Sequence, residues 1–486
     1  MNSIVEVLAS YAASQPDVLF AADNAGNEYS YGQAWQKVRQ AAAYLVDVWK
    51  IGQDDKVMVE CNQDVPYLIA DLACELIGAV FVPIENNASL DRKRNICQET
   101  HAKLWIAAGE TLPFAETAAF AQMMGWEEEI SRITFPQAGQ VAEILYTTGT
   151  TGKSKGIVLT HGANVAVAEN IRCGVQMKKD NTELIPVPVS HSHGLRCCYA
   201  NLLNGGAVVL IDGLMQVGRL FDMVDRYHVT ALDLSPSAAQ LLIRVSKGAF
   251  WEYGRRMDYI QIGTAALPEQ LKKQLVQELP GVRLYNFYGS TESGRSCVLE
   301  FSADTGKNNC IGKATRNAEI VFTDEDRNPV RATESRPGLL ACRGKMNMLG
   351  YWQNPELTRE ILRNGFVFTN DLGYMDAEGY VFIFGRKDDV INYNGIKISP
   401  EEIEEAAVKY PGVRDAACVP QADAVSGQVP RLFITVEDES AFDIKDYRNY
   451  LACHLDGNKL PKRVEMIEAI PRTFNGKIKR KDLIGI

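Results

Sequence analysis

The sequence of 486 residues lacks the features that define fibrous, disordered or membrane-spanning chains. No low-complexity tract, internal repeat or basic-plus-apolar leader segment stands out in it. Its most apolar stretch, 65–84, is interrupted by Asp71, Glu75 and Pro83, so we expect no membrane span. These absences predict a soluble globular protein, which we expect to be cytoplasmic.

The chain also lacks a cysteine pair spaced as CxxC. It has eleven cysteines, an odd number, and Cys197 and Cys198 are adjacent, which is a poor arrangement for an ordinary disulfide. This pattern predicts buried thiols in a reducing compartment.

An excess of positive charge is missing as well. The 51 basic residues are outnumbered by 61 acidic ones, which gives a net charge of −10. Non-specific nucleic-acid binding needs a basic face that displaces counterions, so we expect no nucleic-acid partner. A single nucleotide remains possible as a ligand, because a few placed cations and backbone amides suffice to bind it.

What the sequence does contain is an alternation of strand-like and helix-like segments through its first four-fifths. Such alternation predicts an α/β fold with largely parallel sheets covered by helices, whose ligands bind where loops leave the strands. The expected helices lie at 32–49 and 65–77, and the expected strands at 56–60, 79–84, 103–107, 208–212, 230–234, 259–263 and 283–287.

The pattern changes near the charged segment GRKDD at 385–389. A helix at 401–410, a strand at 431–436 and a helix at 444–455 are enough for one small α+β domain. We therefore predict two domains, 1–387 and 388–486, with the boundary at Asp388.

The strongest chemical signal is the segment YTTGTTGKSKG at 146–156. Its glycines let the backbone curl around an anion, its threonines donate hydrogen bonds, and Lys153 and Lys155 add positive charge. A Walker P-loop would need glycine five positions before Gly152, where Thr147 stands, so that motif is excluded.

TTGTTGKSKG resembles the signature loop of adenylate-forming enzymes, a superfamily of acyl-CoA and aryl-CoA synthetases, peptide-synthetase adenylation domains and luciferases. The resemblance covers nearly the whole chain. Within the superfamily, the chain is most similar to a stand-alone acid–CoA ligase. Its further motifs follow in the family's order: GAVFVPI (78–84), PVSHSHGL (188–195), NFYGSTE (286–292), LGYWQNPELT (349–358), TNDLGYMDAEGY (369–380), GRKDDVI (385–391) and PRTFNGKIKR (471–480).

The resemblance implies a large N-terminal body with a small β subdomain, followed by a mobile C-terminal α+β domain. It also implies a two-step ligase reaction. A carboxylate attacks the α-phosphorus of ATP, with Mg²⁺ as cofactor, to give an acyl-adenylate and pyrophosphate. CoA then takes the acyl group as a thioester and AMP leaves. Transfer to a carrier-protein thiol or to an amine remains an alternative for the second step.

Four residues receive catalytic roles by resemblance. Lys477 would bridge the carboxylate and the α-phosphate, and Glu292 would bind Mg²⁺, which prefers carboxylate and phosphate oxygens. Thr291 would lie near the α-phosphate. His191 would gate or line the acyl pocket.

The nucleotide site and the hinge are also assigned by resemblance. Tyr288 would stack on adenine, and Asp371, expected in a short polar turn, would accept both ribose hydroxyls. Arg386 would meet the same ribose, and Asp388 would be the hinge about which the small domain rotates. The complete nucleotide set is Thr147, Thr148, Gly149, Thr150, Thr151, Gly152, Lys153, Lys155, Gly263, Thr264, Ala265, Asn286, Phe287, Tyr288, Gly289, Thr291, Asp371, Arg386 and Lys477.

The acyl pocket is expected to draw on His191, Ser235, Ala265 and Ser296. Members that activate amino acids carry an aspartate shortly after the histidine motif; no acidic residue occurs at 192–206, so an α-amino acid is disfavoured. An aryl, cyclic or medium-chain acid remains open. A zinc site of the histidine motif with Cys197 and Cys198 matches no common ligand spacing.

Two departures from the family pattern concern the acceptor. Asn392 stands where many CoA ligases have lysine, and Leu339 replaces the usual glutamate after Gly338. A non-catalytic nucleotide-binding regulator is a different class of protein, and the presence of Lys477, Glu292 and Asp371 argues against it. We expect a monomer or a homodimer.

Overall fold

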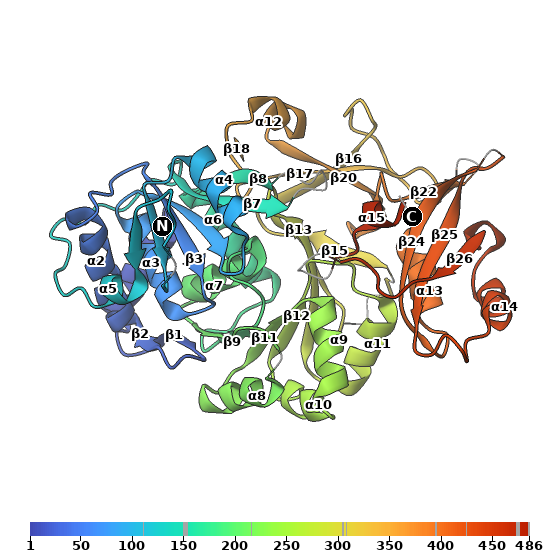
Figure 1. The fold of residues 1–486 in the computed structure, drawn as a ribbon, viewed down its shortest axis with the longest axis horizontal. Helices are drawn as coiled ribbons and strands as arrows, with labels where there is room; N and C mark the ends of the chain where they lie inside the picture. Colours follow the sequence, from blue (N-terminus) through green and yellow to red (C-terminus); the bar gives the residue numbers. More distant parts are fainter. Residues whose placement is uncertain are drawn as a thin grey trace.

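The computed structural model describes residues 1–109, 111–148, 154–214, 216–303, 306–307, 309–393, 396–423, 425–472 and 477–484. Figure 1 shows a large body and a smaller unit beside it that contains the end of the chain. Three sheets organise these parts, of seven, fourteen and five strands.

The seven-stranded sheet has the order β18-β8-β7-β4-β3-β5-β6. β7, β4, β3, β5 and β6 run parallel, while β8 and β18 are added antiparallel. Continuous apolar runs such as VFVPI in β4 suit strands that are covered on both faces. The bounds are β3 Lys56–Cys61, β4 Val80–Glu85, β5 Leu104–Ala107, β6 Thr117–Ala119, β7 Val141–Thr148, β8 Ser154–Thr160 and β18 Gly350–Tyr351.

The fourteen-stranded sheet has a parallel half and an antiparallel half. The parallel half contains β1 Leu19–Asp23, β9 Thr182–Ile185, β10 Ala207–Leu210, β11 Ala231–Leu234, β12 Tyr259–Ile262 and β13 Arg283–Ser290, with β2 Glu28–Ser30 antiparallel at its edge. The antiparallel half contains β14 Gly294–Glu300, β15 Cys310–Ala314, β16 Ala318–Thr323, β17 Gly338–Gly344, β19 Leu362–Arg363, β20 Phe366–Met375 and β21 Val381–Arg386.

Helices cover these sheets and form the main core. That core joins apolar residues of α2, α3 and α7 to residues of both sheets, such as Phe81 and Val208. Among the described residues, no helix has both the length and the apolarity that a bilayer crossing needs. The helices of the body are α1 Ile4–Ser14, α2 Tyr31–Asp47, α3 Val65–Leu76, α4 Leu90–Thr100, α5 Phe120–Met124, α6 His161–Gly174, α7 Ser192–Asn204, α8 Val217–Arg226, α9 Pro236–Val245, α10 Ala249–Gly254, α11 Glu269–Glu278 and α12 Pro355–Ile361.

The five-stranded sheet belongs to the smaller unit, which has a separate apolar core that includes Ile391, Leu432 and Tyr447. Asp388 is exposed and lies between the end of β21 and the start of β22. The elements of this unit are β22 Ile391–Tyr393, β23 Ile396–Ile398, β24 Val413–Asp423, β25 Gly427–Val436, β26 Arg463–Met466, α13 Pro400–Ala407, α14 Ile444–His454, the short 3₁₀ turn Gly457–Lys459 and α15 Arg480–Ile484.

The predicted α/β class is confirmed, and each segment predicted above as helix or strand overlaps an element of that type. One local prediction was wrong. The segment TND at 369–371 is not a turn, because β20 runs through it from Phe366 to Met375 and pairs with β21. Asp371 is paired with Arg386 in this ladder, and the register shifts only beyond the segment, between Leu372 and Gly373.

Candidate active site

The phosphate-binding segment predicted from the sequence forms the two sides of a β-hairpin. β7 and β8 are antiparallel, and Thr147 is paired with Lys155. The predicted residues Gly149, Thr150, Thr151, Gly152 and Lys153 lie outside the described residues, and of Thr148 only the backbone is described. The hairpin therefore brings Thr147 and Lys155 together at the base of the segment.

Tyr351 of β18 connects this hairpin to Glu292. Its hydroxyl donates to Glu292 Oε1 at 2.9 Å, and Lys155 Nζ lies 5.8 Å from the centroid of its ring. The next residue, Trp352, donates its backbone N–H to Gly156 O at 2.7 Å. A Cβ on Gly156 would press against Ile144, Tyr146 and this tryptophan, so only glycine fits there. Tyr351 was not predicted as a site residue from the sequence, because nothing in the segment LGYW indicates that its partner is Glu292.

Asp371 and Arg386, both predicted for the ribose, lie opposite each other on β20 and β21. The Tyr288 hydroxyl donates to Asp371 Oδ2. Loss of solvation, reinforced by the Asp371 carboxylate, raises the pKa of Tyr288 well above its usual range, so the hydroxyl remains a donor. The structure thus brings three predicted nucleotide residues together from three strands of one sheet.

Lys477 lies within electrostatic range of Asp371, Arg386 and Glu292. Loss of solvation lowers the pKa of this lysine, and the carboxylates of Asp371 and Glu292 partly oppose that shift. The residue keeps exposed surface although protein surrounds it, as expected for a side chain in a space open to a ligand.

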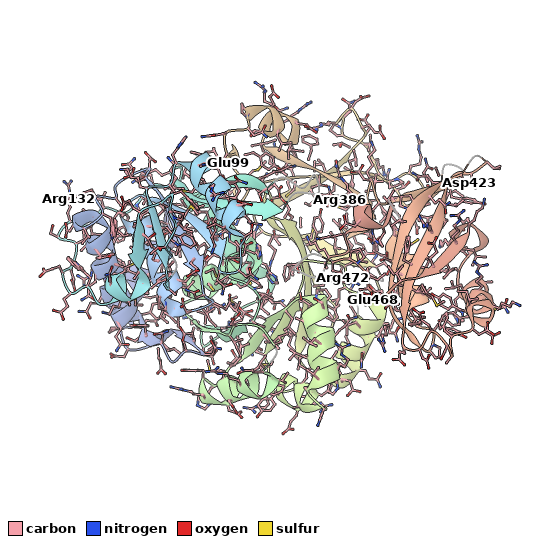
Figure 2. All side chains as sticks on the ribbon, in the orientation of Figure 1. Glu99, Arg132, Arg386, Asp423, Glu468 and Arg472 are labelled. Carbon is pink, nitrogen blue, oxygen red and sulfur yellow. The ribbon has the colours of Figure 1, made fainter. Side chains whose placement is uncertain are left out.

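Two arginines fix the segment that carries Lys477 to the smaller unit. Arg472 forms a bidentate pair with Asp415 of β24, with Nη2–Oδ1 and Nε–Oδ2 distances of 2.7 and 3.1 Å. Arg480 is buried and donates to Glu404 and, at 3.0 Å, to Glu401 of α13. Figure 2 labels Arg386 and Arg472 near the junction of the body and the smaller unit.

His191 is the N-cap residue of α7. Its Nε2 is 3.5 Å from Glu85 Oε1. Burial lowers the pKa of His191, and nearby Arg92, His193 and Lys477 act in the same direction while Glu85 opposes them. His191 is therefore within electrostatic range of Lys477, the predicted catalytic lysine.

Other residues predicted for the acyl pocket or the nucleotide site follow β11 and β12 or lie within β13. Ser235 caps α9 by accepting the Ala238 N–H at 3.1 Å, and Ala265 is half-buried. The Asn286 side chain donates to Ile262 O, which ties β13 to β12. Thr264 has a left-handed backbone with φ 75°. The parallel strands β11, β12 and β13 thus fix the positions of these residues relative to one another.

Close backbone approaches shape the same region. A Cβ on Gly263 would overlap the Phe287 ring, and one on Gly289 would overlap Gly294 O. Thr291 and Glu292 are half-buried and follow directly after β13. Small residues are therefore required where these segments meet.

Ser296, in contrast, does not join the other pocket residues. It is fully buried, and its hydroxyl donates to Ser293 O at 3.2 Å. Because side chains alternate along a strand, the preceding residue of β14, Arg295, points to the opposite face, toward Phe287 and Gln261. Arginine within the apolar strand GRSCVLE was a signal that the sequence analysis missed.

His193, Cys197 and Asp233 place their ligand atoms within 4.8 Å of one another. This trio does not fit a metal. Burial raises the pKa of the Cys197 thiol well above its usual value, and the Arg295 guanidinium already contacts that sulfur at 3.7 Å. His193 Nε2 is 2.7 Å from Asp233 Oδ1, which indicates a hydrogen-bonded pair.

Comparison with known proteins identifies the family of this chain. Residues 8–352 match the profile of the AMP-binding enzymes, and residues 402–477 match the AMP-binding enzyme C-terminal domain. The chain belongs to the AMP-binding enzyme family, whose members form adenylates.

Similar proteins include 4-coumarate–CoA ligase 3 of Arabidopsis thaliana, 27% identical over 94% of this chain and 86% of the relative. A 4-coumarate–CoA ligase of Narcissus pseudonarcissus is 30% identical over 74% of this chain and 66% of the relative. Among solved structures, ATP-bound MatB of Rhodopseudomonas palustris superposes with a TM-score of 0.88 at 23% identity, covering 100% of this chain and 99% of its own. The o-succinylbenzoate CoA synthetase of Bacillus subtilis with its acyl-adenylate has a TM-score of 0.87 at 21% identity, covering 98% and 97%.

Proposed function

We propose that this protein is an acid–CoA ligase that forms AMP. A carboxylate oxygen of the acid attacks the α-phosphorus of ATP, and the bond to pyrophosphate breaks. The CoA thiol, after losing its proton, attacks the carbonyl of the acyl-adenylate and AMP leaves. The observation that carries this proposal is the position of Lys477, in the smaller unit, beside Asp371, Arg386 and Glu292 of the body.

Each of these residues has a role that its chemistry supports. Asp371 can accept two hydrogen bonds from the ribose hydroxyls, and Tyr288 and Arg386 border the same place. A protonated Lys477 would stabilise the charge that develops between the carboxylate and the α-phosphate. The hairpin residues Thr147 and Lys155 would hold the outer phosphates.

Glu292 fits a magnesium ion. Its Oε1 accepts the Tyr351 hydroxyl, and carboxylate oxygens are ligands that Mg²⁺ prefers. When bound, the ion would neutralise triphosphate charge. Tyr351 would hold the carboxylate in place for it.

The domain boundary at Asp388 is part of the same proposal. Asp388 is exposed between two separately packed units, which suits a hinge. Rotation about it would withdraw Lys477 together with α13 and β24, and would bring the hairpin of β22 and β23 toward the reacting carbonyl. Residues 394 and 395 of that hairpin lie outside the described residues.

CoA is the acceptor that we favour, since similar proteins are CoA ligases. A carrier-protein thiol or an amine is the second candidate, favoured by Asn392 and Leu339, which depart from the pattern of CoA ligases. All eleven cysteines are unbridged, which supports a cytoplasmic location. One chain carries every residue used here, so a monomer suffices, and a homodimer would contain two such sites.

The decisive experiment measures pyrophosphate release across a panel of acids, with and without CoA. Release that depends on an acid, together with consumption of CoA, is the expected result. Release without CoA consumption would favour the carrier or amine route. No release with any acid would contradict the enzyme proposal and favour a nucleotide-binding regulator.

A further inference from the structure

Arg295 is a buried cation that forms no ion pair with the residues that the structure describes. Its side chain lies on β14 and the residue is 5% exposed. Nη1 donates to Gln261 Oε1 at 2.5 Å and Nη2 contacts Cys197 Sγ at 3.7 Å, and both of these partners are neutral. No carboxylate lies within ion-pair distance of Arg295 in the part of the chain that the structure describes. Burial of an unpaired guanidinium is strongly unfavourable, so a ligand that supplies the anion would explain why it is there.

The carboxylates in this region already have other partners. Glu183 accepts from the side chains of Asn201 and Gln261, and burial raises its pKa to about 7. Asp233 is paired with His193 through Oδ1, while its Oδ2 is buried without a partner. Neither carboxylate touches the guanidinium.

Aromatic contacts connect Arg295 to the proposed site of adenylation. The guanidinium carbon lies 3.6 Å from the centroid of the Phe287 ring. The same ring also contacts His193, edge to face, with 4.8 Å between the centroids. His193 is two residues from His191, which is within electrostatic range of Lys477. The residue after Phe287 is Tyr288, the partner of Asp371.

The cation therefore lies against Phe287, next to the nucleotide residue Tyr288, in the region where we expect the non-reacting part of the acid to bind. A second acidic group on the substrate would be attracted to it in a region of low dielectric, where charge pairing is strong. Arginine also presents a planar pair of N–H donors that matches a carboxylate.

We propose that the acid activated by this enzyme is a dicarboxylic acid, and that Arg295 binds the carboxylate that does not react. This inference rests on the proposed adenylation of an acid. It makes Arg295 a specificity-determining residue, because an acid with a methyl group in place of the second carboxylate would leave the guanidinium unpaired.

The test compares straight-chain acids of three to six carbons in matched pairs, one ending in a carboxylate and one in a methyl group. Pyrophosphate release gives kcat/KM for each acid. The wild-type protein is expected to prefer one of the diacids over its matched monoacid by at least about tenfold, the scale of one charge-assisted hydrogen bond. Arg295→Met is expected to abolish that preference while the KM for ATP stays unchanged.

Two further variants keep the result interpretable. Arg295→Lys retains the charge and should keep a measurable preference for the diacid. If Arg295→Met does not fold, this variant and the wild-type panel together test whether the charge at this position carries the preference. Arg343→Met removes an exposed arginine that is paired with Glu319 and should leave the preference unchanged.

Three outcomes would overturn the inference. Turnover of the methyl-ended acids equal to or better than that of the diacids would reject the second carboxylate and leave the ligase proposal standing. An equal loss for both acids in Arg295→Met would make the arginine structural only. Absence of pyrophosphate release with every acid would reject the proposed function, and this inference with it.

Discussion

Asp371 and Arg386 are direct partners across the antiparallel strands β20 and β21, and the Tyr288 hydroxyl donates to the same aspartate. Asp371 and Arg386 are held in register by the ladder between β20 and β21, whereas Tyr288 reaches Asp371 from β13, which is not a neighbour of either strand in the sheet. The ladder and the side-chain hydrogen bond hold this group together without a ligand. Substitutions here should therefore affect ligand binding more than folding.

Asp371→Asn is expected to weaken nucleotide binding and to preserve the fold. The amide keeps an oxygen that can accept the Tyr288 hydroxyl, but it loses the charge that strengthens hydrogen bonds to the ribose. A loss of about 10- to 100-fold in affinity for AMP corresponds to hydrogen bonds with a charged group. Calorimetric titration with AMP measures it, and Asp326→Asn, an exposed carboxylate, is the control. Unchanged affinity would remove Asp371 from the ribose site.

Lys477→Ala should separate the two half-reactions. Without its charge, release of pyrophosphate from ATP and acid should fall by about a thousandfold, the effect of removing one strong electrostatic stabiliser. Conversion of a supplied acyl-adenylate to the thioester should persist, because that step does not use the lysine. Lys479→Ala, an exposed neighbour, should spare both. Equal loss of both half-reactions in Lys477→Ala would contradict this division.

The lowered pKa of Lys477 predicts the alkaline limb of the adenylation rate. The lysine acts while protonated, so the rate should fall as pH rises through its pKa, which loss of solvation holds below the ordinary value of 10.5. Lys477→Arg should move this limb to higher pH, because a guanidinium stays protonated. Thioester formation from a supplied acyl-adenylate should lack the limb, and its presence in both half-reactions would assign it to another group.

Asp388→Pro should have the opposite bias to Lys477→Ala. Proline fixes φ near −65° and would hinder rotation of the smaller unit. The structure has Lys477 beside the nucleotide residues, so adenylation should persist while thioester formation falls. Single-turnover assays of each half-reaction measure this. Asp388→Ala, which leaves the backbone free to turn, should retain both. Undiminished thioester formation in Asp388→Pro would place the hinge elsewhere.

Tyr351→Phe should raise the magnesium concentration that half-saturates the enzyme. The substitution removes the hydroxyl that donates to Glu292 Oε1 and leaves the ring beside Lys155. A shift of about tenfold matches the loss of one hydrogen bond to a carboxylate. Binding of Mn²⁺ in the presence of ATP, followed by electron paramagnetic resonance, reports the metal apart from turnover. Tyr253→Phe loses a surface hydroxyl bonded to Asp225 and serves as the control. Unaltered Mn²⁺ binding would show that Tyr351 does not position the metal ligand.

Much of the fold could be predicted from local patterns. The apolar runs at 56–60 and 79–84 are buried strands. The boundary at Asp388 stays a prediction, and the residues from Ile391 onward contribute to a separate apolar core. The turn expected at 369–371 was wrong because polar residues within a strand resemble a turn when the partner strand is unknown. Pairing with β21 satisfies their backbone, which no local pattern reveals.

Contacts within the candidate site could be predicted where one short motif supplies both residues, and not where the partners come from distant segments. Thr147 and Lys155 pair within one hairpin, as their spacing allows. The bond of Tyr351 to Glu292 and the stacking of Arg295 on Phe287 depend on which strands become neighbours and which way each side chain points. Ser296 shows the same limit. Side chains alternate along β14, so Arg295 lies on the face toward Phe287 while the next residue, Ser296, points into the core.

The two arginine pairs around Lys477 have a consequence for how activity is lost under stress. Arg472 attaches one side of the lysine segment to β24, and Arg480 attaches the other side to α13. A loose tail would fray by degrees as denaturant is added, and activity would decline along with it. Here the lysine is part of a cooperatively folded unit, so adenylation and the structure of that unit should disappear in a single transition.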